Sequence, residues 1–147
     1  MKWKSEYATG IHNLDNQHRT ILEIITRFER MGEGRAHWDQ VHPLVQSTRR
    51  FMEYHFDVEE SLMRLIPYSE LRTHRDEHRN ALARIADIER RVGRESARDR
   101  VAPAMKTLLL GHITGSDRRF AQCALDLFRR RPFGAGNDGA HRLRGPE

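Results

Sequence analysis

Histidines and carboxylates recur in four separate stretches of this 147-residue chain, at spacings that suit a two-metal site. Each stretch falls in a different predicted helix. A four-helix bundle places inward-facing side chains from all four helices around one central point, where they can converge on metal. The candidate ligands are His18, His55, Glu59, His74, His78, His112 and Asp117.

Apolar residues at three- and four-residue steps predict helices throughout the chain, and no strand pattern competes with them. Glycine, proline and capping residues set the expected boundaries. The predicted helices run from Leu14 to Gly32 and Gly34, from Asp39 to just before Pro67, from Ser69 to Gly93, and from Ser96 through Leu127. Pro43 lies near the first turn of the second helix. Pro103 lies in the opening turns of the fourth helix or kinks it.

Short connections between these segments favour an all-α, up-down-up-down four-helix bundle. We expect the bundle to occupy residues 1–131, including an extended arm over residues 1–13 that folds back over its open end. Residues 132–147 are rich in glycine and arginine and poor in apolar side chains, which predicts a basic, disordered tail.

Composition limits the class of protein. With 37% hydrophobic and 32% charged residues the chain is large enough for one domain, and it shows no secretory signal or membrane-spanning run. Much of the net charge of +5 comes from the segment that begins at Arg129-Arg-Arg-Pro-Phe133 and leads into the tail, and this segment lacks the interleaved aromatic residues of a nucleic-acid site beyond Phe133. We therefore expect a cytoplasmic protein that binds neither membrane nor nucleic acid, in which the single Cys123 only packs.

Histidines four residues apart share one face of a helix, so His74 and His78 can hold one ion together. Burying five imidazoles on apolar helix faces is costly unless a partner uses their lone pairs. A set of imidazoles and carboxylates suits iron, and also zinc, copper or manganese.

Several other polar residues are assigned away from the metal. Asp15 can either cap the first helix or orient an imidazole, and three glutamates near the candidate ligands are interpreted as solvated or as supporting them. The residues placed at the surface are His12, His37, His42 and His141, and the three glutamates are Glu53, Glu60 and Glu77.

Four strings of residues together resemble the hemerythrin family, specifically the single-domain bacteriohemerythrins, over about residues 3–125. All candidate ligands fall inside these strings, so the combination is far more specific than any one pair. The strings are Gly10-Ile-x-x-Leu-Asp-x-Gln-His18, His55-Phe-x-x-Glu-Glu-x-x-Met63, His74-x-x-x-His78 and His112-Ile-x-x-x-Asp117.

This resemblance implies two non-haem iron ions joined by an oxo or hydroxo bridge. One ion would be bound by His74, His78 and His112, and the other by His18 and His55. The resemblance further implies that Glu59 and Asp117 bridge the pair. The two-histidine iron would keep a vacant sixth position for dioxygen.

The implied function is reversible dioxygen binding for storage, delivery or sensing, without enzymatic activity. The alternative is redox chemistry at the same site, such as handling nitric oxide or peroxide, or iron-nitrosyl repair. A partner protein cannot be named from the sequence. Leu108 and Leu82 stand where many relatives carry Trp and Phe, which predicts wider access to the pocket and faster autoxidation.

The spacing between His112 and Asp117 does not suit a regular helix. Five residues correspond to about 500° of rotation, which leaves the two side chains about 140° apart. If both reach one metal pair, the backbone must depart from α-helical bonding. We predict a π-type turn or local unwinding near Gly115.

The first testable prediction concerns the tail. Deleting residues 132–147 should leave the visible spectrum of the oxygen-exposed, iron-loaded protein unchanged, because the segment lies beyond the last candidate ligand. Absorption spectra of the full-length and truncated proteins check this. Loss of the spectrum on truncation would mean that the tail is part of the fold.

Overall fold

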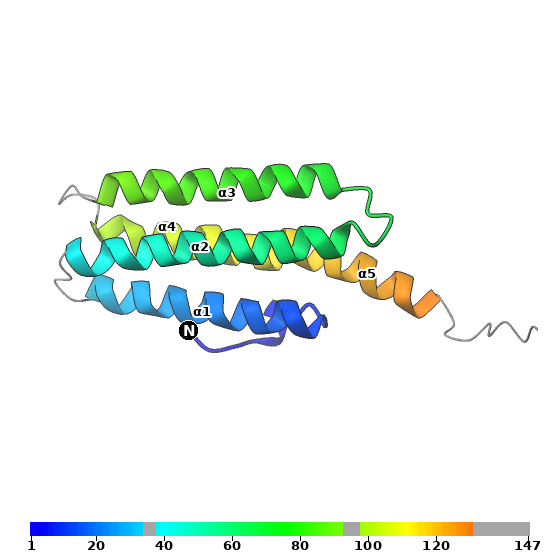
Figure 1. Cartoon of the computed structure of the whole chain (residues 1–147). Helices are drawn as coiled ribbons and strands as arrows, with labels where there is room; N and C mark the ends of the chain where they lie inside the picture. Colours follow the sequence, from blue (N-terminus) through cyan, green and yellow to red (C-terminus); the bar gives the residue numbers. More distant parts are fainter. Residues whose placement is uncertain (34–37, 93–97, 131–147) are drawn as a thin grey trace, which may run out of the picture.

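The computed structural model describes residues 1–33, 38–92 and 98–130, and every regular element in those ranges is helical (Figure 1). Four long helical stretches lie side by side and alternate in direction along the chain. The elements are the 3₁₀ turn η1 (Ser5–Tyr7), α1 (His12–Glu33), α2 (Trp38–Met63), α3 (Leu71–Val92), α4 (Arg98–His112), the π-helical turn η3 (Ile113–Asp117) and α5 (Arg118–Arg130).

The predicted up-down-up-down bundle is therefore confirmed. Helix α1 packs mainly on α4, and α2 packs mainly on α3, while α4, η3 and α5 follow one another as a single long rod (Figure 1). Pro43 and Pro103 both lie in the second turn of their helices, where each removes only one backbone bond. No helix in the described part of the chain is long and apolar enough to cross a membrane.

The first helix begins two residues earlier than predicted. The Asp15 carboxylate accepts hydrogen bonds from the Thr9 amide at 2.6 Å, the Thr9 hydroxyl at 2.7 Å and the Gly10 amide at 3.2 Å. Gly10, with φ of 80°, turns the chain into the helix. Of the two roles considered for Asp15, the capping one is observed, because its carboxylate holds the entrance to α1 rather than an imidazole.

The N-terminal arm lies alongside α1 instead of covering the open end of the bundle (Figure 1). The Met1 ammonium donates to the Thr26 hydroxyl at 2.5 Å, well along that helix. Trp3 stacks under the Arg19 guanidinium at 4.1 Å, and Tyr7 is buried in the core. This attachment, rather than closure of the end, brings the Tyr7 backbone close to the interior.

The connection between α2 and α3 is longer than predicted, because α2 ends at Met63 and α3 begins at Leu71. Tyr68 is buried in this connection, and its amide donates to the Ile66 carbonyl at 2.8 Å. Burial of this ring stabilises a non-helical path. The predicted boundary residues Gly34, Gly93 and Ser96 lie outside the described residues, as do Arg131 and the tail of residues 132–147.

The apolar core consists of two clusters that are separated along the bundle by a buried polar layer. One cluster fills the half that contains the C-terminal end of α1, and the smaller one surrounds Phe120. In α1 the boundary falls between Leu14 and Ile21, and His18 lies there. The candidate ligands thus occupy a layer sealed by apolar packing at both ends.

Two glycines offer a matched test of this backbone. Gly10→Ala should lower the free energy of unfolding by about 1–2 kcal/mol, because its φ is positive and the new Cβ would lie 3.1 Å from Leu125. Gly111→Ala should instead stabilise the protein by about 0.5–1 kcal/mol, since its φ is ordinary and no atom lies within 4 Å of the new Cβ. Urea unfolding measures both. Equal effects of the two variants would contradict this description of Gly10.

Candidate metal centre

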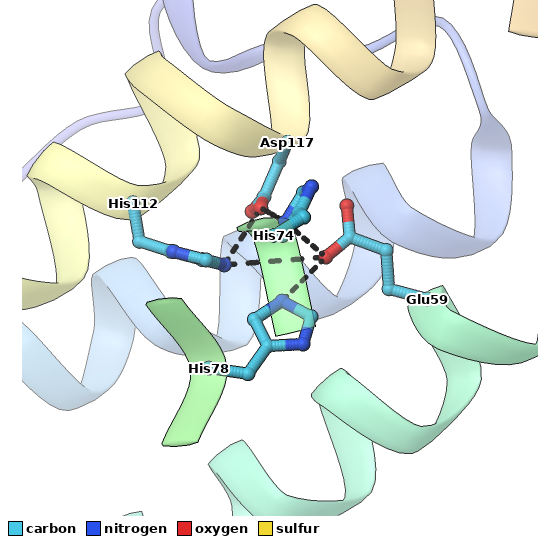
Figure 2. A group of neighbouring side chains, drawn as sticks. All are labelled: Glu59, His74, His78, His112 and Asp117. Atoms are coloured by element: carbon cyan, nitrogen blue, oxygen red, sulfur yellow. Dashed lines mark ion pairs between the residues drawn. The ribbon is translucent and has the colours of Figure 1, made fainter. Parts of the chain in front are cut away.

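All seven candidate ligands are buried and converge at one level of the bundle, and none is more than 8% exposed. Each long helix contributes to the cluster. Figure 2 shows five of these side chains pointing toward one another. The contributions are His18 from α1, His55 and Glu59 from α2, His74 and His78 from α3, His112 from α4 and Asp117 from η3.

The cluster divides into two groups that share Asp117. The larger group is completed by three histidines and Glu59, and the smaller by two histidines. Within each group, one potential ligand atom per residue lies within 4.8 Å of every other. The larger group is Glu59, His74, His78, His112 and Asp117, and the smaller is His18, His55 and Asp117.

The two carboxylate oxygens of Asp117 face different groups. Its Oδ2 lies 3.0 Å from His18 Nε2 and 3.5 Å from His55 Nε2. Its Oδ1 lies 2.8 Å from His112 Nε2 and 3.4 Å from His74 Nε2. A carboxylate in this orientation can supply one oxygen to each of two ions.

Glu59 sits on the side of the larger group. Its Oε2 lies 3.2 Å from His78 Nε2, 3.4 Å from His74 Nε2 and 4.0 Å from His112 Nε2 (Figure 2). The arrangement makes Glu59 a candidate ligand for the three-histidine position. Its bridging role stays a prediction.

The irregular backbone predicted between His112 and Asp117 is confirmed. Residues Ile113–Asp117 form a π-helical turn, which adds one residue to the turn and brings the fully buried Asp117 round to the core. Gly115 lies within this turn, but a Cβ there would meet only Arg119 Nη1 at 3.8 Å, and its φ is ordinary. The turn therefore does not depend on glycine at this position.

Three of the histidines are held from behind by hydrogen bonds at Nδ1. His55 Nδ1 lies 2.7 Å from Gln17 Oε1, and His18 Nδ1 lies 3.3 Å from the backbone carbonyl of Tyr7. His78 Nδ1 lies 3.0 Å from Glu60 Oε1. Donation from Nδ1 leaves the Nε2 lone pair free to face the cluster.

Only part of this outer layer was found from the sequence. Glu60 was among the glutamates expected to be solvated or supporting, and the structure shows it supporting His78. Gln17 stands in the string from Gly10 to His18 that resembles hemerythrins, but the sequence analysis gives it no role; its place directly before His18 in that string is the signal that marks it. The Tyr7 carbonyl has no sequence signal, because any residue supplies one.

The surface histidines lie apart from the cluster. His12 is exposed near Asn16, and His42 is partly exposed with its Nε2 3.5 Å from Glu89. His37 and His141 lie outside the described residues. Glu77 bonds the Ser116 hydroxyl and pairs with Arg119, so it contacts the π turn rather than an imidazole.

The cluster contains buried polar atoms that no hydrogen bond in the described structure satisfies. They include Nε2 of four histidines, both oxygens of Glu59 and Oδ1 of Asp117. Leaving so many donors and acceptors unpaired is costly, and a cation that accepts their lone pairs removes that cost. The donor set of imidazole nitrogens and carboxylate oxygens fits iron. The four histidines are His55, His74, His78 and His112.

Burial and mutual contact shift the protonation of these groups. Burial lowers the pKa of His78 to about 2, whereas burial and the neighbouring Asp117 raise the pKa of Glu59 to about 8. Burial opposes the charged form of His74, but the carboxylates of Asp117 and Glu59 outweigh it and raise its pKa to about 9. A cation bound here must therefore displace protons from Glu59 and His74 near neutral pH.

Comparison with known proteins agrees with this geometry. The family described as "Hemerythrin HHE cation binding domain" matches residues 9–124, which contain every candidate ligand. The chain belongs to the hemerythrin family. Hemerythrins bind dioxygen and contain non-haem iron, so the family also accounts for the kind of donor set found in the bundle.

Several curated bacteriohemerythrins are similar to this hemerythrin. The protein of Clostridium acetobutylicum is 28% identical over 86 residues, covering 56% of this chain and 67% of the relative. That of Pseudomonas aeruginosa is 27% identical over 116 residues, covering 78% and 75%. That of Methylococcus capsulatus is 21% identical over 126 residues, covering 84% and 95%. No solved structure matches this hemerythrin significantly.

The predicted bridging role of Glu59 generates a prediction about stoichiometry. If two irons bind, as the family resemblance implies, Glu59→Ala should lose both together, because removing a carboxylate that bridges the pair would weaken both positions at once. Elemental analysis of the purified variant measures this, and Glu53→Ala, an exposed glutamate of the same helix, serves as the control. Two irons per chain in Glu59→Ala would contradict the predicted bridge.

Proposed function

We propose that this hemerythrin binds dioxygen reversibly at a di-iron centre, for oxygen storage, delivery or sensing in the cytoplasm, and that it is not an enzyme. One observation carries the proposal. Three histidines lie on one side of Asp117 and two on the other, so the two ions held there would have unequal numbers of protein ligands.

The unequal numbers of candidate histidines support a place for dioxygen on the side of His18 and His55. An ion held by His74, His78 and His112 would have three imidazole ligands beside the carboxylates and an oxo or hydroxo bridge, whereas an ion held by His18 and His55 would have only two and so one position fewer filled. Two ferrous ions, when bound, would supply the two electrons that reversible oxygen binding requires. The smaller histidine set therefore supports dioxygen binding at the ion held by His18 and His55.

Charge balance supports a carrier. Two ferrous ions, two carboxylates and one hydroxide leave only about one net positive charge in the buried layer, because the histidines are neutral ligands. Oxygen-activating ferritin-like sites use more carboxylates, in Glu-x-x-His pairs. The only acid three residues before a candidate histidine is Asp15, and its carboxylate is turned toward Thr9 and Gly10.

The protein excludes water from the side proposed for dioxygen. His18, His55 and Asp117 have no solvent exposure, and Phe56 packs beside His55 with ring centroids 5.6 Å apart. Sealing a site in this way prevents protons and water from diverting bound oxygen into irreversible products. The Nδ1 hydrogen bonds of His18 and His55 would hold both imidazoles in one orientation whether or not oxygen is bound.

The alternative function is redox chemistry with nitric oxide or peroxide, or iron-nitrosyl repair, at the same centre. One observation favours it, because the site is approached by two surface hollows. A hollow of about 430 Å³ beside Leu82 reaches His78, and a groove of about 740 Å³ beside Leu108 reaches His112. Both leucines stand where many relatives carry an aromatic residue, so each hollow lacks that bulk.

Absorption spectroscopy of the reduced, iron-loaded protein tests the proposal. A visible charge-transfer band should appear with oxygen and disappear when oxygen is removed, through repeated cycles. A band that forms once and does not reverse, with oxygen consumed, would overturn reversible binding. Stopped-flow mixing with nitric oxide or peroxide then measures turnover, which the alternative requires.

The groove beside Leu108 gives a prediction about autoxidation. Leu108→Trp should slow conversion of the oxygenated protein to the ferric form by about threefold or more, because added bulk narrows solvent access near His112. The decay of the visible band at constant oxygen measures the rate. Leu65→Trp, at a residue 79% exposed and outside the groove, is the control. Equal rates for wild type and Leu108→Trp would show that the groove does not limit access.

A further inference from the structure

The surface groove between α3 and α4 continues beyond His112, along the two helices toward Pro103. Two adjoining hollows, of about 740 and 460 Å³, share Arg84, Asp87, Thr107 and Leu108 along their walls. They therefore form one continuous groove. Arg84 lies in its middle, because that residue borders both hollows.

At one end the groove reaches the back of His112. Unlike the Nδ1 atoms of His18, His55 and His78, that of His112 has no hydrogen-bond partner among the described residues, and it is not among the buried unsatisfied atoms. The ring instead borders the groove, with Nε2 directed at the cluster (Figure 2). An acceptor in the groove can therefore bond the outer nitrogen of this one ligand.

The groove also contains a cationic side chain that is available to a ligand. Its acidic side chains are already paired, Glu77 with Arg119 and Asp87 with Arg90 and Arg91. Arg84 is exposed and has no ion pair within the described ranges of the chain. An anion near Arg84 therefore gains a cation without displacing a partner.

The far end of the groove is apolar. Ile88, Pro103 and Ala104 line it, and Leu108 connects it to the polar end. On α4, Ala104, Leu108 and His112 are four residues apart and share one face. A ligand that lies along this face contacts hydrogen-bond donors at the His112 end and apolar side chains at the Pro103 end.

We propose that this groove binds a medium-chain monocarboxylate, whose carboxylate accepts hydrogen bonds from Arg84 and from His112 Nδ1 while its chain lies along Leu108 toward Pro103. A carboxylate behind a metal-bound imidazole raises the donor strength of that ligand. The bound carboxylate thereby changes the electron donation from His112 to the iron that this residue is predicted to bind. This effect on iron rests on the proposed function, whereas binding in the groove does not.

Calorimetry with hexanoate tests binding to the full-length, iron-loaded protein. Hexanoate should bind, while acetate, which lacks the chain, and hexanol, which lacks the charge, should each bind about tenfold more weakly or less. No binding of hexanoate at millimolar concentrations would overturn the proposal. Hexanol that binds as tightly as hexanoate would overturn the role of the carboxylate.

Two variants locate the site. Arg84→Gln should weaken hexanoate about tenfold or more, whereas Arg72→Gln, an exposed arginine of the same helix outside the groove, should not. Gly111→Leu should also abolish binding, because its side chain enters the groove where no atom lies within 4 Å of the new Cβ. Binding that persists in both variants would place the guest elsewhere and overturn the proposal.

The spectrum of the iron tests the contact with His112. Saturating hexanoate should shift the visible iron band of wild type and leave that of Arg84→Gln unchanged at the same concentration. Binding without a shift would overturn the His112 contact. If oxygen binding proves irreversible while hexanoate still binds and shifts the band, the proposed function fails and the groove proposal stands.

Discussion

The rest of the structure depends on one buried carboxylate, that of Asp117. It has no exposure to solvent, and its two oxygens face histidines that come from all four helices of the bundle. An ionised carboxylate in this position is tolerable only while surrounded by donors or cations. Although burial alone would raise its pKa, His112 and the other imidazoles hold the pKa of Asp117 well below its ordinary value. The buried polar layer therefore surrounds the negative charge of Asp117, which bound cations would stabilise.

Placing that carboxylate required a break in the helix, since a straight α-helix would direct it about 140° away from His112. The π turn η3 supplies the missing rotation and is held from outside, where the Ser116 hydroxyl donates to Glu77 and Arg119 contacts both residues. The irregularity thus lies between two apolar clusters that keep the flanking helices in register. Packing on either side therefore stabilises the irregular backbone of this turn.

The two sides of the metal layer are not equally enclosed. The backs of His18 and His55 are bonded by the chain itself, through Tyr7 and Gln17. The back of His112 instead reaches the groove between α3 and α4. Small molecules at the surface can therefore affect the three-histidine side, while the side proposed for dioxygen stays sealed.

The sequence by itself determined the bundle and the candidate ligands, because helical periodicity and four-residue spacing are local properties of the chain. It also determined that the backbone must depart from an α-helix before Asp117, since that follows from rotation per residue alone. Only the tertiary structure decided which atoms support the ligands. The Tyr7 carbonyl reaches His18 because the arm lies alongside α1, and the α2–α3 connection lengthens because Tyr68 is buried. Such contacts join residues that are distant in sequence, and packing rather than local preference selects them.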